Sequence, residues 1–129
     1  MIPKFRAYDG GSLNHMYQPD EVMVGDGNIW IIDEDSVAGE WIVNNDLELM
    51  QSTGLKDKNG KEIFEGDIVD YKGRKAVIKW HGTYASFIYR FVDELQERVS
   101  EWEPLFLAYH HFEIIGNVYE NKEFLEDME

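Results

Sequence analysis

The sequence predicts a mainly β protein with a minor α component, built around a small barrel. Short β-rich segments follow one another at close spacing, and turns rich in Gly, Asn and Asp separate them. The chain has 129 residues, of which 43% are apolar and 14% aromatic, so it suits one domain with a substantial buried core. Strands this short and tightly turned favour a small barrel over an open sheet.

An N-terminal β subdomain is predicted over residues 1–50. Polar and large residues alternate through residues 4–8, which predicts a strand that ends at a glycine-containing turn. Residues 22–24 and 29–32 flank a Gly-Asp-Gly-Asn turn, so we expect them to form a hairpin. Trp-Ile-Val at residues 41–43 is a further short strand.

The barrel region is predicted over residues 51–119. Asn59-Gly60 is a favoured hairpin centre, and Gly66-Asp67 turns the chain again directly before an apolar segment. Three β-rich segments then predict an antiparallel meander, and a last strand follows; these strands are expected at residues 68–71, 75–80, 84–92 and 114–119. In the second of them, Ala76, Ile78 and Trp80 are expected to share one face.

Two helical segments are expected near the C-terminus. Over residues 93–102, Asp93 is a good N-cap, Leu95, Val99 and Trp102 share one face, and a proline lies just beyond the end. An acidic helical turn is predicted over residues 120–129, with Asn121 as its cap. No repeat or low-complexity linker divides the chain, so we expect one compact unit overall.

Charge is distributed unevenly along the chain. Twelve bases against 26 acids leave a net charge of −14, which disfavours a phosphate backbone or an anionic membrane as the main partner. Residues 1–55 carry −8, residues 56–92 carry +3 and residues 93–129 carry −9. This pattern fits an ordinary solvated surface, and it also fits a basic middle that meets an acidic end of another copy or of a partner.

Three segments together resemble the YopX family. They are Lys-Phe-Arg-Ala-Tyr-Asp at residues 4–9, the glycine-punctuated stretch 50–69, and Ile-Gly-Asn-Val-Tyr-Glu-Asn at residues 115–121. The resemblance implies a mostly β protein with an SH3-like barrel, of a kind encoded by bacteriophages and prophages, and it supplies no activity and no site residues. Tyr8 stands where the pattern more often has Trp, and Lys122 stands where Pro often follows Asn.

Signatures of catalysis and cofactor binding are missing from the sequence. The absence of Cys removes disulfides, thiolate chemistry and cysteine-ligated metals, and no nucleophile elbow, metalloprotease helix, P-loop or calcium loop is present. His110, His111 and Glu113 form the one tempting metal cluster. On a strand at most two of them converge, whereas a catalytic zinc site needs three ligands. We therefore expect no enzyme activity, no metal, no cofactor and no small-molecule substrate.

The sequence favours a non-catalytic accessory protein that binds another protein or assembles with copies of itself. Charge complementarity alone selects its candidate interaction residues, which are Lys56, Lys58, Lys61, Lys72, Arg74, Lys75, Lys79, Asp93, Glu94, Glu97 and Glu101. Two alternatives stay open. One is a nucleic-acid-binding barrel that uses the basic segment 56–79 with Tyr71 and Trp80. The other is an acidic DNA mimic that occupies a host DNA-binding protein.

The sequence also bears on location. The first residues lead into polar sequence without the apolar stretch of a signal peptide, and no apolar run approaches the roughly 18 residues that a membrane helix requires. We expect a cytoplasmic protein of a bacterial host cell, with no membrane partner.

Overall fold

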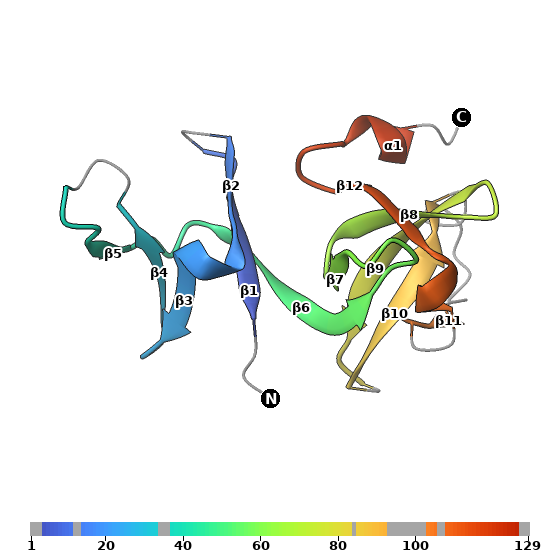
Figure 1. Ribbon diagram of the computed structural model, residues 1–129, viewed down its shortest axis with the longest axis horizontal. Coiled ribbons are helices and arrows are strands. Elements are labelled where there is room, and N and C mark those ends of the chain that lie inside the picture. Colours follow the sequence, from blue (N-terminus) through green and yellow to red (C-terminus); the bar gives the residue numbers. More distant parts are fainter. Residues whose placement is uncertain are drawn as a thin grey trace. The chain divides into compact units, whose positions relative to one another are not determined.

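The computed structural model describes residues 4–11, 14–33, 37–83, 85–92, 103–105 and 108–126. The chain divides into two compact units, Met1–Ser52 (unit 1) and Thr53–Glu129 (unit 2). The prediction of a mainly β protein with a minor C-terminal helix is confirmed, and one sheet curls into a half-barrel (Figure 1). The closure of that sheet into an SH3-like barrel stays a prediction.

The described residues of unit 1 form five short strands, one 3-10 turn and the start of a longer strand, β6. In chain order these are β1 (Phe5–Asp9), β2 (His15–Tyr17), η1 (Pro19–Glu21), β3 (Val22–Gly25), β4 (Asn28–Ile32), β5 (Trp41–Val43) and β6 (Glu48–Lys56). The predicted first strand, the hairpin and the strand at residues 41–43 are confirmed, whereas the sequence analysis did not predict β2. β1 pairs antiparallel with β2 on one side and with β6 on the other.

One buried cluster lies in unit 1. It comprises Ala7, Tyr17, Val22, Ile31 and Leu47, and Met16 and Met50 of the same unit are buried as well. Phe5, Ile29 and Leu49 pack against its margin. Alternation along β1 explains how Phe5 and Ala7 reach this cluster, because residues two apart on a strand share a face. The strands β3, β4 and β5 form a separate three-stranded antiparallel sheet in that order.

Unit 2 contains the longer meander and the C-terminal elements. Its elements after β6 are β7 (Glu62–Phe64), β8 (Asp67–Tyr71), β9 (Arg74–His81), β10 (Ser86–Phe91), β11 (Glu103–Pro104), η4 (Tyr109–His111), β12 (Glu113–Asn117) and α1 (Glu123–Glu126). The five-stranded sheet has the order β11-β10-β9-β8-β12 and is antiparallel throughout. The predicted meander is therefore confirmed. The predicted helix over residues 93–102 lies outside the described residues.

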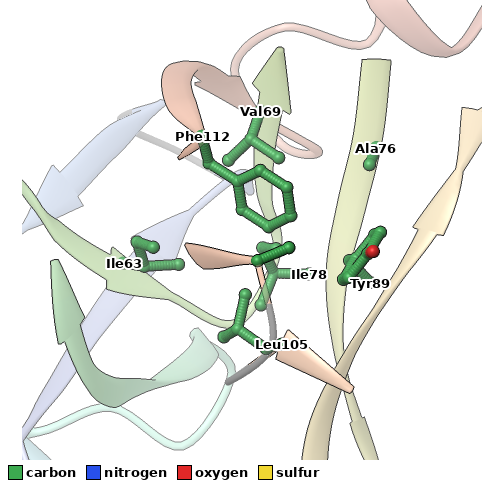
Figure 2. Packing of buried hydrophobic residues seen from close by; sticks show 8 residues of the cluster. Ile63, Val69, Ala76, Ile78, Tyr89, Leu105 and Phe112 are labelled. Atoms are coloured by element: carbon green, nitrogen blue, oxygen red, sulfur yellow. The ribbon is translucent and has the colours of Figure 1, made fainter. Parts of the chain in front are cut away.

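Both faces of this sheet are covered. One face carries the larger cluster, which comprises Ile63, Val69, Ala76, Ile78, Tyr89, Leu105, Ala108 and Phe112 (Figure 2). The opposite face carries Ile68, Val77 and Val92, against which Phe124 and Leu125 of α1 pack. Successive residues of β9 thus enter different cores, because strand side chains alternate between faces.

Ala76, Ile78 and Trp80 share one face of β9 as predicted, and the Trp80 ring contacts Phe87 beside their cluster. Trp80 is nevertheless 46% exposed, because it lies near the end of β9. Two other details of the predicted elements are wrong. The last strand ends at Asn117, where the chain enters a turn. Asn121 does not cap α1 with its side-chain oxygen; that oxygen accepts from the Asn117 N–H instead.

Candidate interaction surfaces

The glycine-punctuated stretch that the sequence analysis singled out builds turns. The Asp57 carboxylate is 5% exposed, and it accepts three backbone N–H groups. Its Oδ1 accepts from Asn59 at 2.9 Å and from Lys61 at 2.8 Å, and its Oδ2 accepts from Ile114 at 3.0 Å. The Asp57 side chain therefore fastens the β6–β7 turn to β12. This use of a buried carboxylate is structural, because a buried acceptor must be satisfied.

Two further motifs have the same character. Asp67, 1% exposed, accepts the Phe64 N–H at 2.8 Å and so closes the turn between β7 and β8. Asn117, 6% exposed, accepts the N–H groups of Tyr119 and Glu120 at 3.0 and 2.9 Å. The burial of these polar side chains is therefore explained by their hydrogen bonds within turns, and no ligand is needed to explain it.

Gly116 has a steric reason to be glycine. A Cβ atom added at this position would clash with the Asn121 side chain, since it would lie only 3.0 Å from the Asn121 Cβ. The same Asn121 side chain accepts the Asn117 N–H at 3.1 Å, so it is held in place by the turn. The sequence Ile-Gly-Asn-Val-Tyr-Glu-Asn thus comprises the end of β12 and the packed turn that follows it.

The histidine pair lies in a 3-10 turn, which corrects the strand geometry on which the sequence analysis relied. His110 and His111 belong to η4, and their rings stand 4.1 Å apart at a tilt of 42°. Within the described ranges, no group of three or more His, Cys, Asp or Glu side chains is placed to hold a metal ion. The His111 ring instead stacks on Tyr71 at 6.1 Å, as part of an aromatic cluster.

The basic candidate residues fall into separate groups. Lys56, Lys58 and Lys61 surround the β6–β7 turn, and all three are exposed. Lys72 and Arg74 lie at the β8–β9 turn, also exposed. Alternation along β9 places Lys75 and Lys79 on the face opposite Arg74. Lys75 accordingly lies over the Phe124 ring of α1 at 5.5 Å, away from Arg74.

The acidic candidate residues Asp93, Glu94, Glu97 and Glu101 lie outside the described residues. The predicted pairing of the basic middle with the acidic helix therefore stays a prediction.

The β8–β9 turn combines cations with aromatic rings. The Arg74 guanidinium carbon lies 3.6 Å from the centre of the Phe91 ring, and the Lys72 ammonium lies 5.2 Å from the centre of the Tyr71 ring. Tyr71 also stacks on Phe91 at 6.4 Å and on His111 at 6.1 Å. These contacts are cation–π and ring–ring interactions made within the chain. They leave the rings partnered by groups of the protein itself.

A second surface lies in unit 1 and is apolar. In the β3-β4-β5 sheet, Met23 pairs with Trp30, Trp30 with Val43 and Ile32 with Trp41, so these five side chains share the face opposite the core. We call Met23, Trp30, Ile32, Trp41 and Val43 the outer face. Met23 is 48% exposed, Trp41 38% and Val43 44%, and Ile42 on the core side of β5 is 42% exposed.

The sequence carries a signal for this surface, which was not among the predicted interaction residues. A strand that covers a core with one face and meets water with the other alternates apolar and polar residues. Residues 22–24, 29–32 and 41–43 are apolar at every position. Such continuous runs indicate strands that are covered on both faces, whereas the described core covers one.

No helix among the described residues is long and apolar enough to cross a membrane.

Comparisons with known proteins identify relatives of the whole chain. The family model described as "YopX protein" matches residues 4–126. Among solved structures, the crystal structure of protein EF1440 from Enterococcus faecalis is similar, with a TM-score of 0.59 and 30% sequence identity over 97% of this chain and 99% of that one. A search of curated proteins finds no match.

Proposed function

This chain belongs to the YopX family, and from that starting point we propose that it is a non-catalytic module that binds protein through the apolar surface of unit 1. We further propose that it acts in the bacterial cytoplasm as an accessory protein of phage or prophage type. The single observation that carries the proposal is the outer face of the β3-β4-β5 sheet, where Met23, Trp41 and Val43 are each more than one third exposed.

Contiguous exposed apolar patches are rare on soluble monomers and mark interaction sites. Here the patch lies on one sheet and includes a tryptophan, a residue type enriched at the energetic centres of protein interfaces. The polar residues that could have suggested chemistry are engaged elsewhere, since Asp57, Asp67 and Asn117 each accept backbone N–H groups in turns. These two observations together support contact with protein over catalysis.

The proposal is tested by capture of protein on the immobilised full chain. Wild-type chain is compared with a Trp41→Lys/Val43→Lys variant, and with a Lys72→Glu/Arg74→Glu variant as the matched control in unit 2. Any protein retained, whether a bacterial protein or added copies of the chain, should be lost with the unit 1 variant and kept with the control. The proposal would be contradicted if both variants retained the protein, or if none of the three chains, wild type included, retained any.

Nucleic-acid binding through the β8–β9 turn is the second candidate. Lys72 and Arg74 beside Tyr71 and Phe91 supply the cations and rings that single-strand binding uses. The Arg74 guanidinium already occupies a face of Phe91, however, and the net charge of −14 opposes a polyanion. A mobility shift with single-stranded DNA at about 50 mM salt, abolished by Arg74→Ala, would favour this candidate.

A further inference from the structure

The strand β5 ends its sheet, and no other strand of the described part of the chain pairs with its outer edge. β5 is the terminal strand in the order β3-β4-β5. Asp33 donates its N–H to the Glu40 carbonyl, and Asn44 donates its N–H to the Ile29 carbonyl. Because hydrogen-bonded and non-hydrogen-bonded pairs alternate along an antiparallel ladder, the Ile31–Ile42 pair between these two is also hydrogen-bonded. The backbone groups of Ile42 therefore point toward β4. Those of Trp41 and Val43 point away from it, toward the open edge.

This edge lacks the devices that keep sheet edges apart. Natural edge strands are blunted by Lys, Pro, bulges or inward-pointing charges. β5 contains Trp41, Ile42 and Val43, its pairing with β4 is regular, and all three residues are exposed. A short apolar edge with unprotected backbone groups is a template for another strand.

We propose that β5 pairs antiparallel with β5 of a second copy of this chain, with Ile42 on the two-fold axis. This inference rests on the proposed function and names its partner. In this register, Trp41 lies opposite Val43 of the second copy, and the outward N–H and C=O groups of both residues are paired in both directions. In this register every residue of β5 lies opposite a β5 residue of the second copy. A register centred on Trp41 or Val43 would leave part of the strand without a partner.

Side-chain placement agrees with the same register. Residues directly opposite each other in an antiparallel pair lie on one face. The two outer faces therefore join into a single apolar surface, and Ile42 meets Ile42 of the second copy on the core side. The contact is isologous, since each copy offers the same patch, and it closes at two subunits.

Charge placement favours a second copy in this register. Glu40 lies opposite Asn44 of the second copy, so no carboxylate directly faces another across the paired strands, and the nearest residues are apolar. At longer range, two copies each carrying −14 repel one another. The association therefore strengthens as salt screens that repulsion, because its contact is apolar. An interface between the basic middle and an acidic end would weaken with salt instead.

The test places charge on the two-fold axis. Ile42→Asp and Ile42→Lys each bring two like charges face to face, whereas a one-to-one mixture brings opposite charges together. By light scattering on the full chain at high salt, wild type should approach twice 15.1 kDa, each variant alone should stay at 15.1 kDa, and the mixture should again approach the doubled mass. Recovery in the mixture shows that the single variants are folded.

Val37→Lys is the matched control, because Val37 is fully exposed and lies outside both β5 and the outer face. It should leave the doubled mass unchanged. A wild type that is monomeric at all salt concentrations, variants that dimerise alone, or a mixture that stays monomeric would overturn the proposal. A monomeric wild type that still captures another protein through Trp41 and Val43 would overturn this inference and leave the proposed function standing.

Discussion

The two units use apolar residues differently. In unit 2 both faces of the main sheet are covered, so that Ala76 and Ile78 lie in one cluster and Val77 lies in another. In unit 1 a cluster of five buried residues covers one face of the β3-β4-β5 sheet, and the other face remains apolar and exposed. Unit 2 thus buries the apolar residues of its main sheet with its own elements, whereas unit 1 leaves an apolar sheet face exposed.

Buried polar residues hold turns in both units. In unit 1, Asp9 is 8% exposed and its Oδ1 accepts the Gly11 N–H at 3.0 Å. The buried Asp57, Asp67 and Asn117 of unit 2 each accept backbone N–H groups across turns. The distinctive segments are therefore fold determinants, since residues 4–9 supply β1 of unit 1 and residues 115–121 supply the end of β12 and the following turn in unit 2. The exposed apolar surface that we propose as the binding site lies on β3, β4 and β5 of unit 1, outside these distinctive segments.

The largest expected loss of stability comes from the buried core of unit 2. Phe112 is fully buried and its ring lies 4.9 Å from Tyr89 and 5.2 Å from Tyr71. Phe112→Ala should lower the free energy of unfolding by about 4 kcal/mol through lost transfer energy and a residual cavity. Denaturant unfolding measures this loss, and Phe112→Leu should cost clearly less. An equal loss for both substitutions would contradict the packing account.

The next effect concerns the turn that Asp57 fastens. Asp57→Ala leaves three backbone donors without their acceptor, and we expect a loss of about 3 kcal/mol in the free energy of unfolding. Asp57→Asn retains one carbonyl oxygen and should fall between wild type and Asp57→Ala. Thermal unfolding of the three chains orders them. Wild-type stability in Asp57→Ala would show that the carboxylate is free for another role.

A smaller effect is expected at Gly116. The added methyl group of Gly116→Ala meets the Asn121 side chain, so the turn must shift, at a cost of roughly 1–3 kcal/mol. Combining the change with Asn121→Gly removes the obstruction and should recover part of that loss. Chemical denaturation of the single and double variants measures the recovery. Strictly additive losses would contradict the steric explanation.

The smallest effect on stability is expected on the outer face of unit 1. Val43→Lys should change the free energy of unfolding of the monomer by less than about 0.5 kcal/mol, because the side chain is 44% exposed. It should nevertheless abolish association, since it places a charge on the edge strand. Val37→Lys, at a fully exposed position, serves as the control for both measurements. A large loss of stability would mean that the outer face is part of the fold of unit 1.

Local patterns predicted most of the fold. Short apolar runs bounded by turns located β3, β4 and β5, and glycine-containing turns with period-two alternation located the β8–β9–β10 meander, since these signals act over a few residues. β2 (His15–Tyr17) was missed because it contains no run of β-branched residues. The placement of His110 and His111 in a 3-10 turn was also missed, since histidine has no strong preference for either state.

The candidate site was harder to predict than the fold. Grouping residues by charge along the chain joined Arg74 with Lys75, yet adjacent residues of a strand point to opposite faces. The outer face of unit 1 arises from residues on three strands, and only the register of those strands brings Met23, Trp30 and Val43 into one row. Whether this face is exposed depends on which other elements pack against it, and local sequence patterns do not carry that information.

The salt dependence of self-association tests the central claim most directly. Sedimentation velocity of the wild-type chain is measured at a fixed micromolar concentration while sodium chloride rises from about 50 mM to 1 M, over which the Debye length shrinks several-fold. We predict that the dimer fraction rises with salt, because apolar β5 edges meet against a long-range repulsion. A dimer fraction that falls with salt would contradict this account and would place the contact between basic and acidic segments.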